Sequence, residues 1–272
     1  MGTTIGVVGT GNMGVALLKG WLRSPDSETS FVVYDVVQTK VDELAVQEKV
    51  TGAKSIEELV DVAQAIVLTV KPKDLDNVLG RMRPHLREDK VVISSAAGVP
   101  LEAIRSGAGQ KAAVFRIMPN LGVALGQGVV AVTTEAGTDP ALTESVLGLL
   151  APLGLVESVS EGLFDAITAV SGSSLAFLAV ALEAMEDGGV RVGMPRPMAR
   201  AFVRQTALAG CQLLQASSDS AAEMKDQVTS PGGTTIAGLA VLEDGAVRGA
   251  FVRAIEEATE RSRELRDASR PH

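Results

Sequence analysis

Near its amino terminus the chain reads Ile5-Gly6-Val7-Val8-Gly9-Thr10-Gly11-Asn12-Met13-Gly14, and this stretch decides the fold of the first domain. An apolar run is followed by three glycines in the spacing GxGxxG, and a helical pattern begins at once. In this arrangement Gly9 permits a tight turn, Gly11 lets a pyrophosphate approach the backbone, and Gly14 lets the helix pack on the strand. The N–H groups at the start of the helix then hold phosphate oxygens. The pattern predicts a dinucleotide-binding unit, and we expect the following residues to contact the cofactor: Gly9, Gly11, Asn12, Met13 and Gly14.

An acid at the end of the second apolar run predicts which nicotinamide cofactor is used. Asp35 stands 21 residues after Gly14, the distance at which an acid accepts hydrogen bonds from the adenosine ribose. A carboxylate there repels the 2′-phosphate of NADPH. No arginine follows closely, and the nearest cation in the sequence is Lys40. The sequence therefore predicts a preference for NADH over NADPH.

Composition and charge exclude several classes of protein. The chain has 272 residues, of which 46% are hydrophobic, so it can bury a substantial core. Its net charge of −8 argues against nucleic-acid binding, which needs clustered basic residues. The single cysteine, Cys211, excludes a disulfide framework and favours a reducing cytoplasm, in which it is a small buried hydrophobe. No signal peptide is evident, and the most apolar helix, Leu175 to Met185, is too short to span a bilayer.

Strands and helices alternate in the first part of the chain, which predicts a mostly parallel, doubly wound sheet of the Rossmann type over residues 1–160. The expected strands are Ile5–Val8, Phe31–Tyr34, Ala65–Val70, Lys90–Ser94, Ala113–Ile117, Gly128–Thr133 and Leu155–Val159. The expected helices are Asn12–Leu22, Val37–Gln47, Ser55–Asp61, Leu75–Met82, Pro100–Arg105 and Pro140–Leu150.

Strand patterns are absent after about Glu161, so we predict an all-α domain over residues 161–272. Its expected helices are Ser174–Asp187, Pro197–Gln215, Thr234–Leu242 and Val247–Asp267, with Gly188-Gly189 ending the first of them. Ser174–Met185 is apolar on nearly every face and must therefore be buried on all sides. A small helical domain can achieve this only against another subunit, which predicts a dimer.

Three further segments carry chemistry. Val70-Lys71-Pro72 ends a strand beside the expected ligand crevice, where Lys71 either reaches the ligand or is simply solvated. Ser94-Ser95-Ala96-Ala97-Gly98 ends the next strand with small residues, which suit either a ligand ring or close packing. Ser230-Pro231-Gly232-Gly233-Thr234-Thr235 precedes a helix. Its spacing fits an anion cradle of backbone N–H groups and a Ser/Thr helix cap about equally.

Histidine and metal-ligand clusters are missing from the pattern. His85 lies in a polar loop and His272 is terminal, so no histidine suits general acid catalysis, and no His/Cys cluster suits a metal. The substrate should therefore need little proton transfer from the enzyme. A cyclic imine fits, because its protonated form is already electrophilic.

With these segments in place, the chain resembles the pyrroline-5-carboxylate reductase family over nearly its full length. The matching segments are Gly9–Gly14, Val70-Lys71-Pro72, Ser95–Gly98, Arg116–Asn120, Ser171-Gly172-Ser173, Asp187–Pro195 and Lys225–Leu239. The resemblance implies NAD(P)H-dependent reduction of 1-pyrroline-5-carboxylate to proline. It also implies dimers whose helical domains entangle, often assembled into decamers of five dimers.

The resemblance implies roles for particular residues. Gly233, Thr234 and Thr235 would hold the substrate carboxylate, and the Thr235 hydroxyl would hydrogen-bond the imine nitrogen as the catalytic group. Ser230 and Gly232 would shape this substrate-binding loop. Further residues would line the cofactor: Val70, Lys71, Pro72, Ala97, Gly98 and Asn120.

The sequence departs from the family pattern at two places. Leu121-Gly122 stands where the family usually has Thr-Pro, and Ser174-Leu175-Ala176-Phe177 stands where it usually has Gly-Pro-Ala-Tyr. The loss of both prolines loosens the backbone locally, and Phe177 lacks the tyrosine hydroxyl. Two alternatives therefore accompany proline synthesis: a related cyclic imine carboxylate such as a piperideine carboxylate, or a non-catalytic dinucleotide-binding regulator.

Overall fold

The protein forms two compact units in the computed structural model, which describes residues 3–24 and 28–268. The first unit consists of the described residues up to Gly172 together with those from Ala258 onward, and the second is Ser173–Glu257. His272 lies outside the described residues. The division after residue 160 rests on sequence pattern and stays a prediction.

The first unit contains one eight-stranded sheet in the order β3-β2-β1-β4-β5-β6-β7-β8. Neighbouring strands run parallel except β6 and β7, which are antiparallel. The strands are β1 Thr4–Val8, β2 Ser30–Tyr34, β3 Val50–Gly52, β4 Ala65–Leu68, β5 Val91–Ser94, β6 Ala113–Pro119, β7 Gly128–Thr134 and β8 Gly154–Ser158. The predicted mostly parallel sheet is confirmed.

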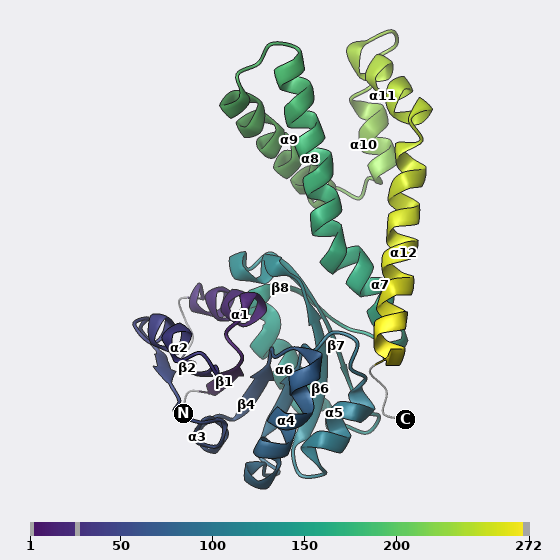
Figure 1. The fold of residues 1–272 in the computed structure, drawn as a ribbon. Coiled ribbons are helices and arrows are strands. Elements are labelled where there is room, and N and C mark those ends of the chain that lie inside the picture. The colour runs from purple at the N-terminus through teal and green to yellow at the C-terminus, as the bar shows by residue number, and fades with distance from the viewer. Residues whose placement is uncertain (1–2, 25–27, 269–272) are drawn as a thin grey trace. The chain divides into compact units, whose positions relative to one another are not determined.

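Helices cover both faces of this sheet (Figure 1). On one face α1 (Asn12–Leu22), α2 (Gln38–Leu44) and α6 (Pro140–Leu150) build a core with the inward residues of the strands. On the other, α3 (Ile56–Val62), α4 (Pro72–Met82) and α5 (Leu101–Ala108) build a second core. The strands are apolar on both faces for this reason, and the sheet is doubly wound.

Short helical turns join these elements. They are the 3₁₀ turns Arg83–His85, Leu121–Leu125, Ala151–Leu153 and Glu161–Leu163, the α-helix α7 Phe164–Ile167 and the π-helical segment Thr168–Ser173.

Two predicted boundaries beside β4 are wrong. The strand ends at Leu68 rather than Val70, and α4 begins at Pro72 rather than Leu75. Proline is favoured in the first turn of a helix, where its missing N–H would have no partner. The short strand β3 and the π-helical segment were not predicted at all.

The end of the last helix, α12 (Val247–Ala268), packs within the first unit. Its anchor is Asp165, which is 5% exposed and lies in α7. Ser262 Oγ donates to Asp165 Oδ1 at 2.7 Å, and the Arg266 guanidinium donates to Asp165 Oδ2. The buried carboxylate is therefore satisfied by residues that follow it by 97 positions, for Ser262, and 101 positions, for Arg266.

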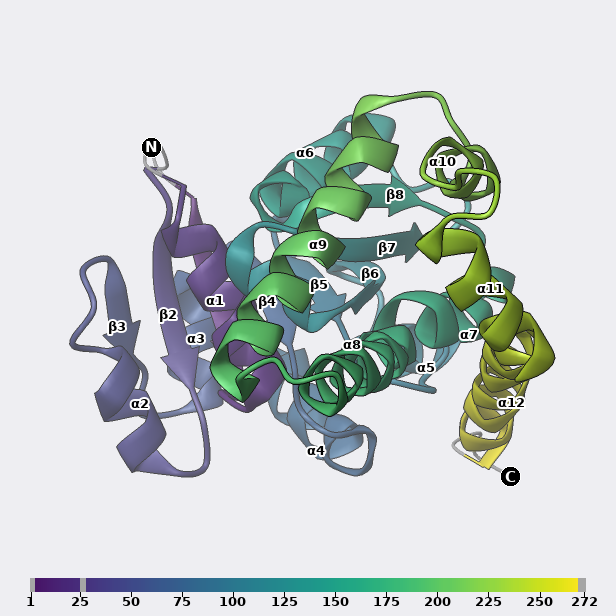
Figure 2. The ribbon, with the colours of Figure 1, turned by 90° about the horizontal axis from the view of Figure 1, so that it is seen from above.

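Helices alone form the second unit: α8 (Ser174–Arg191), α9 (Arg196–Ala216), α10 (Ala221–Gln227), α11 (Thr234–Asp244) and the first part of α12. Helices α8 and α9 lie side by side (Figure 2). The predicted change from strands to an all-α region is confirmed.

The expected stop at Gly188-Gly189 is wrong, because α8 continues to Arg191. Packing explains these glycines better than helix termination does. A Cβ at Gly189 would lie 3.1 Å from the Cβ of Ala199 and 3.4 Å from the sulfur of Met194, so the glycine lets α8 approach α9 closely.

Helix α8 presents large apolar side chains to the surface of the single chain. Val180 is 67% exposed and Met185 is 58% exposed. The prediction that the apolar helix is too short to span a bilayer is wrong. The continuous helical run Glu161–Arg191 has 31 residues and is long and apolar enough to cross a membrane by length and composition alone. One such run is weak evidence for a membrane span, and burial in another subunit requires the same apolar surface.

Candidate active site

The glycine turn lies where the strand order reverses, between β1 and β4. Gly9 has φ +95°, which favours glycine, and its N–H donates to the Tyr34 carbonyl at 2.8 Å. A Cβ at Gly14 would lie 2.1 Å from the Gly9 oxygen, so Gly14 allows α1 to pack on the turn. At Gly11 no atom lies within 4 Å of the Cβ position, so space remains there for a ligand.

Asp35 follows β2 and is bound to the same turn. Its Oδ2 accepts hydrogen bonds from the backbone N–H of Thr10 at 2.7 Å and from the Thr10 hydroxyl at 3.0 Å, and its Oδ1 accepts from Val37 N–H at 2.9 Å. Burial by itself raises the pKa of Asp35. The hydrogen bonds from Val37 and Thr10, helped by the charge of Lys40, outweigh burial and lower the pKa below its ordinary value. Asp35 is therefore a fixed anion.

A cavity of 430 Å³ opens at this end of the sheet. The ends of β1, β2 and β4 and the start of α4 line it, which is the crevice expected for a ligand of a doubly wound sheet. Its lining residues are Val8, Gly9, Gly11, Tyr34, Asp35, Val36, Val37, Lys40, Ile56, Thr69, Val70, Lys71, Lys73, Asp74, Asn77, Val78 and Arg81. Val36 is 87% exposed there and offers an apolar surface to a flat ring.

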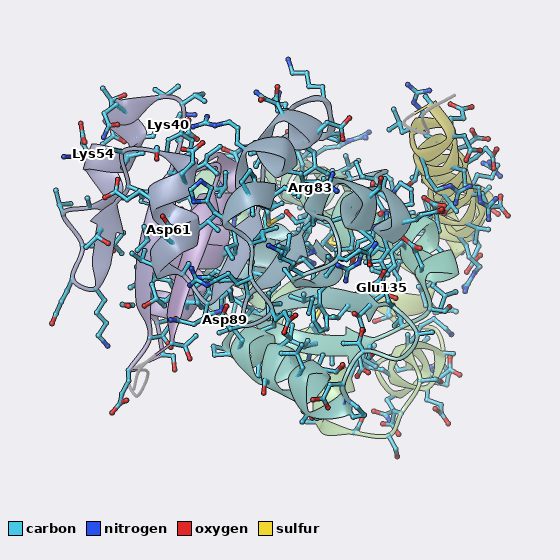
Figure 3. All side chains as sticks on the ribbon, turned by 90° about the horizontal axis from the view of Figure 1, so that it is seen from below. Lys40, Lys54, Asp61, Arg83, Asp89 and Glu135 are labelled. Atoms are coloured by element: carbon cyan, nitrogen blue, oxygen red, sulfur yellow. The ribbon has the colours of Figure 1, made fainter. Side chains whose placement is uncertain are left out.

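Several residues of this cavity escaped the sequence analysis, among them Val36 and Arg81. Arg81 reaches the cavity from α4, and no local signal ties that arginine to the glycine turn. The guanidinium of Arg81 donates to both carboxylate oxygens of Glu57, at 2.9 and 3.0 Å, so its charge is already compensated. Lys40, on the helix that follows Asp35 (Figure 3), lines the cavity as well.

The predicted residues beyond the turn are placed as follows. Val70 and Lys71 line the cavity, and Lys71 is the exposed residue that precedes α4 at Pro72. Ala97 is exposed, whereas Gly98 is buried. Gly98 has φ +74°, and a Cβ there would lie 3.4 Å from the backbone nitrogen of Arg266.

A second cavity, of 400 Å³, shares Gly11 and Lys40 with the first. Asn12 lines it together with Leu121 of the 3₁₀ turn. Of the cofactor residues predicted on α1, Asn12 faces open space, Met13 is half-buried against the core, and Gly14 is buried against the glycine turn.

In the second unit, the loop before α11 has the form of an anion cradle. Gly232 has φ +68°, and α11 begins at Thr234 with Gly233 as its cap and no side-chain capping bond. A Cβ at Gly233 would lie 2.3 Å from the Ser230 hydroxyl oxygen, so glycine is needed for this loop. The first N–H groups of a helix have no partner within it and can bind an anion.

One detail of this loop differs from the implied role. The N–H of Gly233 donates to the Ser230 carbonyl at 3.1 Å. This N–H is engaged within the loop, and the N–H groups of Thr234 and Thr235 remain as the donors at the start of α11. Thr235 is half-buried, while Ser230, Gly232 and Thr234 are exposed.

A doubly wound sheet with a glycine turn and a fixed acid at its switch point defines a dinucleotide-dependent oxidoreductase. Family models agree with this class. Residues 4–98 match NADP oxidoreductase, coenzyme F420-dependent, and residues 161–265 match pyrroline-5-carboxylate reductase dimerisation. The chain belongs to the pyrroline-5-carboxylate reductase family.

Relatives and solved structures extend over nearly the whole chain. The pyrroline-5-carboxylate reductase of Synechocystis is 35% identical over 266 residues, covering 97% of this chain and 99% of the relative. The structure of 1-pyrroline-5-carboxylate reductase from Streptococcus pyogenes is 32% identical, with a TM-score of 0.85 over 96% of this chain and 98% of that one. The NADP-bound Plasmodium falciparum pyrroline carboxylate reductase is 25% identical, with a TM-score of 0.86 over 97% and 98%.

Proposed function

We propose that this protein reduces 1-pyrroline-5-carboxylate to L-proline, using NADH in preference to NADPH. Membership of the family along nearly the whole chain carries the proposal. Two of its elements are preformed: the nucleotide turn in the first unit and the loop before α11 in the second.

The cofactor is held by the first unit. The open space at Gly11 fits a pyrophosphate against the start of α1, and the exposed Val36 fits the adenine. Asp35, fixed by Thr10 and Val37, accepts hydrogen bonds from the ribose hydroxyls. When bound, the reduced nicotinamide supplies a hydride. Further contacts along the cofactor come from Asn12, Met13, Val70, Lys71, Pro72, Ala97 and Gly98, whereas the Asn120 carboxamide is engaged with the protein itself.

The substrate is held by the second unit. Thr234 and Thr235 N–H groups bind its carboxylate at the start of α11, and Ser230, Gly232 and Gly233 shape the loop. The Thr235 hydroxyl hydrogen-bonds the ring nitrogen. In the reaction the carbon of the protonated C=N bond gains the hydride, and the π electron pair of that bond becomes the lone pair of the nitrogen. The amine then takes a second proton from solvent. The chain's task is positioning and charge pairing rather than proton transfer.

The cofactor preference rests on charge. Asp35 repels a 2′-phosphate, and Arg81 is compensated by Glu57 and therefore offers little attraction to one. Replacing Asp35 by Ser should raise the ratio of NADPH to NADH in kcat/KM by about ten-fold or more, since one like-charge contact is removed. Unchanged ratios would refute the assignment.

We propose that the protein forms a homodimer and that five such dimers can assemble into a decamer. We also propose that it works in the cytoplasm and binds neither nucleic acid nor a membrane. The exposed apolar face of α8 supports the dimer.

The two alternative functions are not favoured, because the relatives that match along the whole chain are pyrroline-5-carboxylate reductases. The deciding experiment follows NADH oxidation by the purified protein with 1-pyrroline-5-carboxylate, and with the 1-piperideine carboxylates as controls. Faster turnover of the five-membered ring is expected. Turnover of only a six-membered imine would refute the substrate, and NADH binding without any turnover would favour a regulator.

A further inference from the structure

The carboxamide of Asn120 is held in one orientation at the end of β6. Asn120 is 8% exposed, and its Oδ1 accepts hydrogen bonds from Gly122 N–H at 3.1 Å and from Val129 N–H at 3.2 Å. Two backbone donors identify the oxygen side of the amide, so Nδ2 must point the other way. There it donates to the carbonyl of Ser171 at 3.0 Å.

Ser171 belongs to the π-helical segment Thr168–Ser173. A π turn shifts the backbone hydrogen bonds of a helix by one residue, which opens a carbonyl to an outside donor. Within the segment, Thr168 Oγ1 donates to the Phe164 carbonyl at 2.7 Å and Ser171 Oγ donates to the Ile167 carbonyl at 2.8 Å. The bond from Asn120 differs from these two, because it joins the segment to the sheet.

The segment is also the place where the chain leaves the first unit, whose first stretch ends at Gly172. Ala169, in the same turn, is completely buried. A Cβ at Gly172 would meet the terminal methyl of Met118, on β6, at 3.4 Å. The last turn of the first unit is thus fixed to β6 by packing and by the Asn120 carboxamide.

We propose that the side chain of Asn120 is a positioning group that fixes the direction in which the chain leaves the cofactor-binding unit. The proposal rests on the proposed function, in which one unit holds the cofactor and the other the imine. Hydride transfer is sensitive to small displacements, so loosening this turn lowers kcat while the cofactor still binds.

Gly122 helps to hold the Asn120 carboxamide in this orientation. Its N–H holds Asn120 Oδ1, and its carbonyl accepts from Gln127 N–H at 3.1 Å. A Cβ at Gly122 would lie 2.8 Å from the Gln127 carbonyl oxygen and 3.0 Å from Asn120 Oδ1. The Leu121-Gly122 pair therefore supplies a donor that a proline at position 122 lacks, and the glycine is held by two hydrogen bonds.

The test compares Asn120→Asp, Asn120→Ala and the control Thr168→Val. The aspartate keeps the two accepted bonds but faces the Ser171 carbonyl with a carboxylate oxygen, which cannot donate. Thr168→Val removes a hydrogen bond within the same turn and leaves Asn120 untouched. Thermal unfolding first confirms that each variant is folded.

Hydrogen exchange of the peptide covering 168–173 is the first readout, and it is independent of substrate. At pH 8 we expect about ten-fold faster exchange than wild type for both Asn120 variants, and less than about two-fold for Thr168→Val. Unchanged exchange in both Asn120 variants would overturn the proposal.

Kinetics and cofactor binding are the second readout. We expect kcat of Asn120→Asp and Asn120→Ala to fall about ten-fold at pH 8, with the NADH Kd within about two-fold. A rise in Kd that accounts for the whole loss would overturn the proposal, because the carboxamide would then contact the cofactor directly. A wild type that turns over no 1-pyrroline-5-carboxylate would refute the proposed function alone, since exchange and NADH binding still test Asn120.

Discussion

Replacing Gly11 by Ala should abolish tight cofactor binding while leaving the fold intact. The Cβ position at Gly11 has no atom within 4 Å, so a methyl group strains nothing in the protein. The residue has φ −71° and ψ −170°, which alanine adopts freely. The methyl group would instead occupy the space in which the pyrophosphate approaches the start of α1.

The magnitudes separate these two effects. At a helix cap, alanine is less favourable than glycine by about 0.5 kcal/mol. Alanine has less conformational freedom than glycine in the unfolded chain, and this stabilises the folded state by about 0.4–1 kcal/mol. The two effects nearly cancel, so the free energy of unfolding should barely change. Displacing the pyrophosphate loses two charge-assisted hydrogen bonds of about 1.5 kcal/mol each, which raises the NADH Kd about 100-fold.

Gly14→Ala is the matched control, because it adds the same methyl group three residues later. Its Cβ would lie 2.1 Å from the Gly9 oxygen and 2.7 Å from Thr69 Oγ1, so the helix must shift. We expect a loss of at least about 2 kcal/mol of stability for this variant. Urea unfolding measures stability, and quenching or enhancement of NADH fluorescence measures Kd.

Two results would refute this reasoning. Gly11→Ala could bind NADH with a Kd within about three-fold of wild type, which would place the pyrophosphate elsewhere. It could also lose as much stability as Gly14→Ala, which would mean that the open space at Gly11 is filled by protein.

Three further predictions concern the substrate loop, an ion pair and the assembly. Thr235→Ala should lower kcat about ten-fold or more without changing NADH binding, and full activity would remove the proposed role of its hydroxyl. Hydrogen bonds from Arg81 hold the pKa of Glu57 at about 2, below its ordinary 4.5. Glu57 should therefore stabilise the fold above about pH 4.5 and lose this contribution as the pH falls toward 2. The contribution is at most about 1 kcal/mol, because the side chains of Arg81 and Glu57 are 38% and 32% exposed and solvent screens the pair. Comparing urea midpoints of wild type and Glu57→Gln at pH 6 and pH 3 measures this, and a difference that does not shrink would contradict it. Light scattering at micromolar concentration should show at least a dimer, whereas a monomer would refute the burial of Ser174–Met185 in another subunit.

The nucleotide turn could be predicted because its determinants are local. A glycine with positive φ at Gly9 and a helix starting at Asn12 follow from neighbouring residues, and Asp35 ends the next strand. The alternation of apolar runs was likewise sufficient for the doubly wound sheet, apart from β3, which has only three residues.

Other features depend on residues far apart and leave no local signal. Arg81 reaches the cofactor cavity from α4, and the bond from Asn120 to Ser171 spans 51 residues and ends in a π turn, which has no sequence signature. Helix α10 is different, because Ser220 and Glu223 form a capping box that the sequence displays. That helix could have been predicted.

The bonds from Ser262 and Arg266 to Asp165 have a consequence for how the protein is made. During synthesis at roughly 5–20 residues per second, the 97 residues added after Asp165, up to and including Ser262, take about 5–20 s. Until then Asp165 lacks both hydrogen-bond partners that it has in the complete chain. The contacts of the end of α12 with the first unit can therefore form only late in translation. A chain terminated before Ser262 would contain every predicted cofactor residue of the first unit but none of these bonds to Asp165.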